Sequence, residues 1–211
     1  MKNVRSLVED KAALDLKAKI AEAGDDLVRI QECIDGLQIP DMAKRQHLGC
    51  ASLHAAVEHS QGIVILVEEG LTGTALALLR PMLEAFTRGV WVLWCATETE
   101  IDEVGNDTFP SSKTIVAALE QLPRYSSGAL SQIKGVMWSG LCSLTHAGTA
   151  QTIPRLGSVG IGSEFSANDA ALALAWASQF GYASAGEFAI LANRQDIADA
   201  IVTRLRAVGA K

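Results

Sequence analysis

The segment Gly73–Thr97, GTALALLRPMLEAFTRGVWVLWCAT, constrains the fold more than any other part of this 211-residue chain. Wound at the helical period of about 100° per residue, it is apolar over most of its circumference. One polar stripe runs along it, made of Arg80, Glu84, Arg88 and Trp91. Because a helix that is apolar on most sides is buried on most sides, the sequence predicts a central core helix here.

Charged side chains in a core helix need partners, because unpaired buried charge costs several kcal/mol. Glu84 lies four residues from both Arg80 and Arg88, so it can form an ion pair with each on the helix surface. One positive charge is left over, and we expect it to meet a carboxylate elsewhere in the fold or the anion of a ligand. Pro81 has no N–H to donate to the carbonyl of Ala77, so we also expect a kink at this point.

The remaining sequence also predicts helices, and no segment shows the alternation typical of strands. We therefore expect an all-α protein, an antiparallel bundle of about six or seven helices without a sheet, in one domain covering residues 1–211. The expected core is 41–150, on which an N-terminal helix, 3–36, and C-terminal helices, 166–209, pack. Within this core we expect helices at 42–69, 73–97, 113–122 and 129–147, and loops at 98–110 and 151–164. Predicted N-caps are Asp41, Ser111 or Ser112, and Ser166, the last in a capping box with Asp169.

Composition limits the partners. The net charge of −6 argues against broad nucleic-acid binding, which needs a basic surface, so we expect no DNA partner. Arg80, Glu84 and Arg88 would lie at bilayer depth if the central helix crossed a membrane, so we expect no membrane span. An N-terminus without an apolar leader, together with four scattered cysteines that form no CxxC pair, predicts a cytoplasmic protein with reduced thiols.

Metal and nucleophile motifs are weak in this sequence. The pairs Cys50/His54 and Cys142/His146 each lie on one helix face, and together they would supply four zinc ligands if their helices met. The segment GSVGIG, 157–162, lacks the preceding strand of a phosphate-binding loop, and Trp138-Ser139-Gly140 lacks half of a nucleophile elbow. We expect no metal site and no cofactor.

The candidate site combines the polar stripe with the end of helix 129–147. The candidate catalytic residues are His146 and Arg80. The other expected members of a ligand-binding or polar cluster are Glu58, His59, Glu84, Arg88, Trp91 and Ser143. An arginine that holds a phosphate and a histidine that transfers a proton are the minimal set for metal-independent RNA cleavage. The same residues can equally close a structural ion network.

Two motifs resemble a known family. EHSQGIVILVEEGLTGTALALLRPMLEAFTRGVWVLWCAT, 58–97, resembles the signature of an uncharacterised bacterial family that pairs an E-H helix with an R-P-x-x-E-A-x-x-R-G-x-W helix. SLTHAGTAQ, 143–151, resembles the second motif of that family. The family is similar in outline to HEPN-type helical proteins, many of which are dimeric RNases of toxin–antitoxin and phage-defence systems.

The resemblance implies a HEPN-like core, a homodimer, and RNA or a protein as partner. The nuclease motif of HEPN proteins has an arginine a few residues before its histidine, at positions held here by Ser139, Gly140 and Leu141. Two hypotheses follow. The first is a non-catalytic helical protein whose polar cluster is a structural network or a small anionic-ligand pocket. The second is a HEPN-like metal-independent RNase, which needs His146 and Arg80 or Arg88 within a few ångströms and open to solvent.

Overall fold

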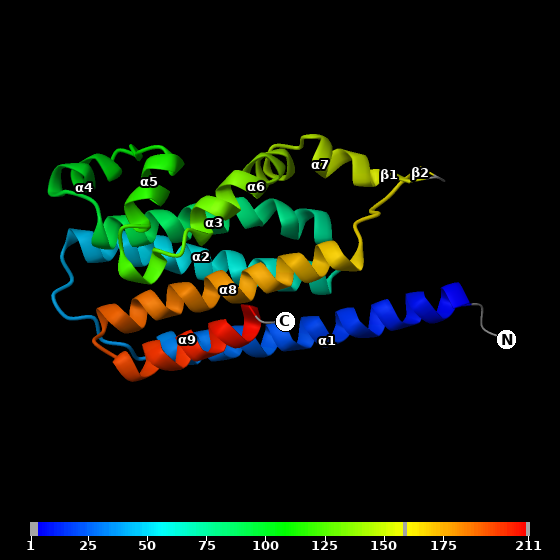
Figure 1. Ribbon diagram of the computed structural model, residues 1–211, viewed down its shortest axis with the longest axis horizontal. Helices are drawn as coiled ribbons and strands as arrows, with labels where there is room; N and C mark the ends of the chain where they lie inside the picture. Colours follow the sequence, from blue (N-terminus) through cyan, green and yellow to red (C-terminus); the bar gives the residue numbers. More distant parts are fainter. Residues whose placement is uncertain (1–3, 158–159, 210–211) are drawn as a thin grey trace.

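The computed structural model describes residues 4–157 and 160–209, and over these residues it confirms the all-α prediction. The chain forms a bundle of long helices with shorter helices packed on one side of it (Figure 1). The elements are α1 Val4–Ile34, α2 Lys44–Glu68, α3 Thr72–Trp94, α4 Glu98–Val104, α5 Ser112–Leu119, η1 Pro123–Tyr125, α6 Ala129–Thr145, α7 Thr149–Thr152, η2 Ile153–Arg155, β1 Leu156–Gly157, β2 Gly160–Ile161, α8 Ala167–Leu191 and α9 Gln195–Gly209.

Several expectations about the elements are wrong. The stretch 151–164, expected to be a loop, begins with the end of α7 and contains η2. The acidic stretch after α3, expected to be a loop, begins with α4, because Thr97 forms a capping box with Glu100 that satisfies the first N–H groups. The expectation of no sheet fails at β1 and β2, which pair antiparallel with Leu156 opposite Ile161. Two residues per strand are too few to show an alternating pattern in the sequence. The GSVGIG segment partly lies outside the described residues, and its described ends belong to this hairpin.

The predicted caps are partly confirmed. The Ser111 side chain accepts the N–H of Thr114 at the start of α5, and Ser166 forms the expected capping box with Asp169. Asp41 does not cap α2: the N-cap is Ala43, which has no side-chain cap, and Asp41 adopts a left-handed φ of 50°.

The central position of α3 is confirmed, since it packs against α2, α5, α6 and α8 (Figure 1). Two glycines let α2 and α3 approach closely. A Cβ atom added at Gly49 would lie 2.4 Å from the Leu93 side chain, and one at Gly89 would lie 3.1 Å from the Gly49 carbonyl oxygen. The Leu93 side chain therefore packs directly on Gly49, and the backbones of α2 and α3 come close at Gly89.

The long C-terminal helices are held by a buried carboxylate. Asp26 of α1 accepts hydrogen bonds from the Tyr182 hydroxyl (2.9 Å) and from Arg204 Nη2 (2.6 Å). Because these donors come from α8 and α9, one side chain joins three helices.

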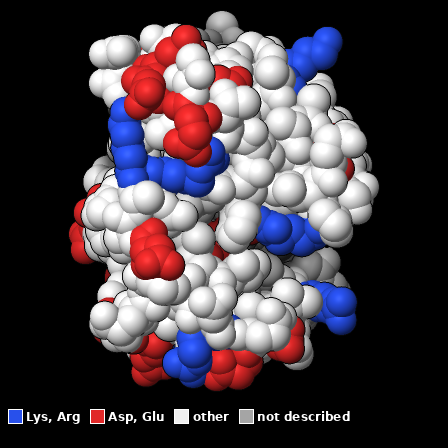
Figure 2. Space-filling model, turned by 90° about the vertical axis from the view of Figure 1, so that its left-hand side faces the viewer, with Lys and Arg blue, Asp and Glu red and all other residues white. Residues whose placement is uncertain are grey.

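Charged side chains also tie α4 to α2. Lys44 pairs with Asp102 and Arg45 with Glu98, each at 2.6 Å. Figure 2 shows this end of the molecule, where acidic and basic side chains lie side by side.

In the described part of the chain, α2 is the one helix with the length and apolar composition of a membrane span, with a mean hydropathy of 1.2 and 39% of that window buried. Its residues Leu53, Ile63 and Val64 are buried in the core that it shares with α3 and α8. The bundle therefore buries one part of the apolar surface of α2. The cytoplasmic location stays a prediction.

Candidate functional site

Pro81 creates a docking point for another helix. α3 continues through Pro81, and the Ala77 carbonyl, which receives no N–H from the proline, accepts the Thr145 hydroxyl at 3.1 Å. Thr145 is the last residue of α6, and His146 follows it as the C-cap. The proline of α3 thus fixes the end of α6, and with it the position of the histidine.

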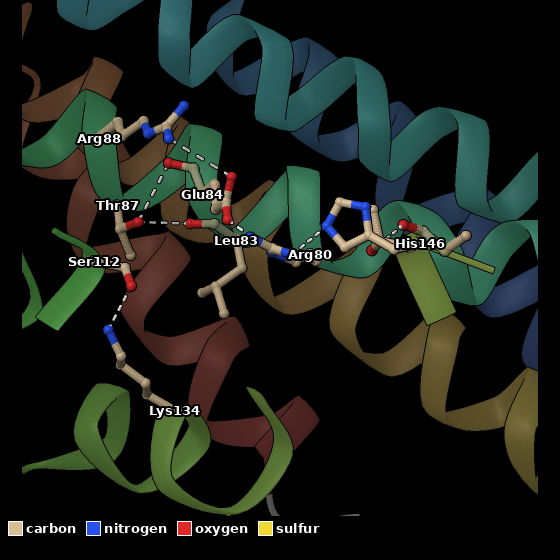
Figure 3. Close-up of polar contacts among 10 residues, drawn as sticks. Arg80, Leu83, Glu84, Thr87, Arg88, Ser112, Lys134 and His146 are labelled. Carbon is tan, nitrogen blue, oxygen red and sulfur yellow. Dashed lines mark hydrogen bonds and ion pairs between the residues drawn. The ribbon is translucent and has the colours of Figure 1, made fainter. Parts of the chain in front are cut away.

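His146 meets Arg80 at this contact. Arg80 Nη1 lies 2.7 Å from His146 Nε2, as Figure 3 shows. A guanidinium has only donors, so Nε2 of the imidazole must accept and the ring proton lies on Nδ1. His146 is exposed to solvent. The pair therefore consists of an imidazole that accepts a hydrogen bond from a guanidinium at the protein surface.

Glu84 lies between the two arginines of the stripe. Its carboxylate accepts Arg80 Nε at 2.8 Å and lies 3.7 Å from Arg88 Nη2, so both expected ion pairs form. The side chains of Arg80, Glu84 and Arg88 keep 21%, 23% and 39% of their surface exposed. The expectation that this stripe is buried holds for Trp91 and is wrong for the three charged residues, which are half-buried. Ion pairs with this exposure contribute about 0.2–1 kcal/mol each.

Two aromatic rings and a lysine complete the site. Arg80 lies over the ring of Trp138 at 5.1 Å, and Arg88 lies over Phe109 at 4.6 Å. Lys134 Nζ lies 5.1 Å from the same Trp138 ring. Rings under cations restrict the motion of long side chains and add about 0.5–1 kcal/mol per contact.

Lys134 donates a hydrogen bond of 2.5 Å to Ser112 Oγ of α5. Burial lowers the pKa of Lys134, the charge of Lys113 lowers it further, and Glu84 opposes both. The charge of Glu84, which pairs with the arginines of the stripe, therefore acts on Lys134 as well. We call Arg80, Glu84, Arg88, Lys134 and His146 the α3–α6 cluster.

The α3–α6 cluster has more positive than negative charge. The cluster contains three cations, Arg80, Arg88 and Lys134, and one carboxylate, Glu84, and no other carboxylate in the described residues bonds to any of these cations. Apart from His146, two positive charges are in excess, in a chain whose net charge is −6. The predicted leftover charge is therefore present, and it lacks an internal acidic partner in this part of the molecule.

The other predicted site residues lie apart from the cluster or support it. Glu58 faces His54 of its own helix at 3.8 Å on an exposed surface, and burial lowers the pKa of His59. Within the described residues, neither Glu58 nor His59 bonds to the cluster. Trp91 is buried against Phe109, with ring centroids 6.4 Å apart. Ser143 Oγ accepts the Ala150 N–H at 3.0 Å, and so holds α7 on the end of α6.

The two Cys–His pairs do not form a metal site. Among the residues that the structure describes, no three His, Cys, Asp or Glu side chains gather closely enough to hold a metal ion. Cys50 and His54 lie on α2, whereas Cys142 and His146 lie at the end of α6, where His146 contacts Arg80.

A second polar cluster, which sequence reasoning missed, is centred on Glu187 of α8. Glu187 is 1% exposed and accepts hydrogen bonds from Trp94 Nε1 (2.6 Å), the Tyr125 hydroxyl (2.6 Å), and Arg124 Nε (2.7 Å) and Nη2 (3.0 Å). Burial and the adjacent carboxylate raise the pKa of Tyr125 well above its usual value. Every oxygen of Glu187 is satisfied, so this cluster is a structural joint between α3, η1 and α8.

Spacing was the one signal for the residues in and around the α3–α6 cluster that sequence reasoning missed. Lys134, Trp138 and Thr145 are four and seven residues apart, which puts them on one stripe of α6. This stripe faces the Arg80 stripe of α3, but only the structure shows that the two meet.

Comparison with known proteins gives one match. No curated protein and no solved structure matches the chain. The model of a family of unknown function, DUF6988, matches residues 53–207, a range that contains the whole α3–α6 cluster. The predicted membership of an uncharacterised family is thus confirmed, while the likeness to HEPN proteins stays a prediction. The chain belongs to the DUF6988 family of unknown function.

Proposed function

We propose that this protein is a non-catalytic helical binding protein whose α3–α6 cluster holds a small ligand bearing a phosphate or a carboxylate. The observation that carries the proposal is the excess of positive charge around the exposed Arg80–His146 pair. A partly exposed group of cations without enough internal acid is a site where an anion is stabilised.

Several donors of the cluster are free for a ligand. A guanidinium has five N–H groups, and Arg80 uses one for Glu84 and one for His146. Lys134 uses one of its three for Ser112, and the His146 ring presents Nδ1–H. The Trp138 ring holds both cations before a ligand arrives, which reduces the entropy cost of binding.

A second candidate function is metal-independent RNA cleavage in the manner of HEPN-type nucleases. The 2.7 Å contact between Arg80 and the exposed His146 favours it, because the contact places a group that can transfer a proton beside a group that can hold a phosphate. Proton abstraction by Nε2 requires that Arg80 first leave it, since the lone pair accepts the arginine N–H. Catalysis thus needs a rearrangement that anion binding does not, and binding is the better-supported function.

Isothermal titration of inorganic phosphate and pyrophosphate tests the first proposal. Wild type should give saturable binding, and Lys134→Met should weaken it about tenfold or more, the effect of losing one charge-assisted hydrogen bond. Lys17→Met, which removes an exposed charge from α1, is the matched control and should bind like wild type. An equal affinity for wild type and Lys134→Met would contradict the proposal.

Incubation with single-stranded RNA in the presence of a chelator tests the second candidate. Cleavage by wild type that disappears in both His146→Ala and Arg80→Ala, at matched levels of folded protein, would move the nuclease ahead of the binding protein. Growth of a bacterial host expressing the same three proteins gives an independent readout. RNA that stays intact with wild type removes the nuclease from consideration.

The predicted homodimer remains a proposal. Exposed aliphatic side chains on α2 and α6, Ile65 at 57% and Val136 at 79%, support it. Sedimentation equilibrium should give twice the chain mass of 22.3 kDa, and a single-chain mass at high protein concentration would exclude the dimer.

A further inference from the structure

A hollow of about 670 Å³ lies between α6, α8 and α9, away from the residues of the α3–α6 cluster. The hollow is lined by residues of α8, by Phe86 of α3, by the start of α6 and by residues of α9. A smaller hollow of about 140 Å³ shares Arg124, Tyr125, Ala183, Val202 and Leu205 with it, so the two form one groove. Its size lies within the range of small-molecule sites, about 300–1,000 Å³.

The walls of this groove are aromatic and aliphatic. Phe86 packs edge-on against Tyr125 at 6.1 Å and against Phe180 at 5.3 Å. Leu130 and Leu205 add aliphatic surface, and Val202 keeps 44% of its surface open to solvent. A rigid aromatic floor beside an exposed valine suits an apolar ligand body.

The polar side chains that line the groove differ in whether they already have a hydrogen-bond or ion-pair partner. Arg124 is committed to Glu187 through two hydrogen bonds. Gln179 and Arg206 also line the groove, and in the described part of the chain neither has a hydrogen bond or ion pair. Among the described residues that line the groove, Arg206 is therefore the cation that has no internal partner.

We propose that this groove binds an amphipathic organic anion, an alkyl or aryl carboxylate. Its apolar part lies over Phe86 and Phe180, and its carboxylate accepts from Arg206 and Gln179. The free positive charge of Arg206 in a mostly apolar groove selects an acid over a neutral molecule of the same shape. This site is independent of the anion site proposed for the α3–α6 cluster.

Isothermal titration with sodium decanoate, below its micelle concentration, tests the proposal on the full chain. Wild type should bind decanoate at one site, and Arg206→Gln should weaken binding about tenfold, the effect of one lost charge-assisted hydrogen bond. Arg194→Gln removes an exposed charge near the start of α9, outside the groove, and should leave the affinity unchanged. Decanol, which has the same chain and no charge, should bind more weakly than decanoate.

Filling the groove gives a second, independent arm. Val202→Trp places a large ring over the aromatic floor from an exposed position, so the fold should tolerate it, and Ala183→Trp fills the groove from α8. Either variant, once shown by circular dichroism to be folded, should abolish decanoate binding.

Four results would overturn the proposal: no saturable binding by wild type, equal affinity in Arg206→Gln, equal affinity for decanol, or binding retained in a folded Val202→Trp. A dimeric wild type that becomes monomeric in Val202→Trp would also overturn it, because a second copy of the chain would then cover the groove. Lys134→Met should weaken phosphate binding and leave decanoate binding unchanged. This difference separates the groove from the anion site proposed for the α3–α6 cluster.

Discussion

Thr145 is expected to matter because of a proline on another helix. Its hydroxyl donates to the Ala77 carbonyl at 3.1 Å, and Pro81 cannot supply the N–H that this carbonyl would receive in a regular helix. Thr145→Val keeps the shape of the side chain and removes the donor. A half-buried carbonyl left without a partner costs about 1–3 kcal/mol, so we expect unfolding free energy to fall by about 1–2 kcal/mol.

Pro81→Ala should make Thr145 dispensable. Alanine restores an N–H that can donate to the Ala77 carbonyl, so the Thr145→Val change in that background should cost about 0.5 kcal/mol or less. The coupling between the two positions should therefore be about 1 kcal/mol, which a double-mutant cycle resolves. Urea denaturation of the four proteins, followed by circular dichroism, supplies the four free energies.

Additive effects would refute this reasoning. If Thr145→Val costs the same with proline and with alanine at position 81, the carbonyl of Ala77 does not depend on the threonine. The contact with Arg80 would then be the interaction that positions His146.

Three further predictions concern stability. Glu187→Ala should lower unfolding free energy by about 3 kcal/mol in urea denaturation, because it leaves the donors of Trp94, Arg124 and Tyr125 unpaired; a loss below about 1 kcal/mol would show that they find other partners. Gly49→Ala should lower the unfolding free energy by about 1–3 kcal/mol, because the added Cβ atom would clash with the Leu93 side chain. Gly24→Ala, whose added Cβ atom has no neighbour within 4 Å, is the control and should be neutral or stabilising. A Gly49→Ala protein as stable as Gly24→Ala would contradict the close packing of α2 on α3. Burial lowers the pKa of His59 in the folded state, so its contribution is full above the unfolded pKa of about 6.5 and is lost as pH falls toward the folded value. The decline in thermal stability below pH 6.5 should accordingly be shallower in His59→Gln, and an unchanged pH profile would exclude His59 as its source.

The helical core could be predicted from the sequence because its signals are local. The apolar period of 73–97, the glycines that end helices and the Ser166–Asp169 capping box each depend on residues a few positions apart. α4 was missed because its acidic composition resembles a surface loop, while its cap at Thr97 lies just inside the segment expected to end the central helix.

The candidate site could be predicted only in part. The Arg80–Glu84–Arg88 ladder follows from spacing on one helix, and the Arg80–His146 contact was a hypothesis that the structure supports in its geometry. Lys134 and Trp138 join the site through the packing of α6 on α3, which no local pattern encodes. Glu187 and Arg124 lie 63 positions apart, and their pairing likewise depends on the tertiary fold.

The account rests on the claim that the α3–α6 cluster takes up an anion between α3 and α6. The most direct measurement is ¹⁵N NMR of the His146 imidazole and the Arg80 guanidinium during a phosphate titration, in wild type and in Lys134→Met. In wild type, the resonances of both groups should shift and then saturate as phosphate is added. In Lys134→Met, the phosphate concentration at half-saturation should be about tenfold higher. Resonances of His146 and Arg80 that stay in place while phosphate is raised to tens of millimolar would contradict it.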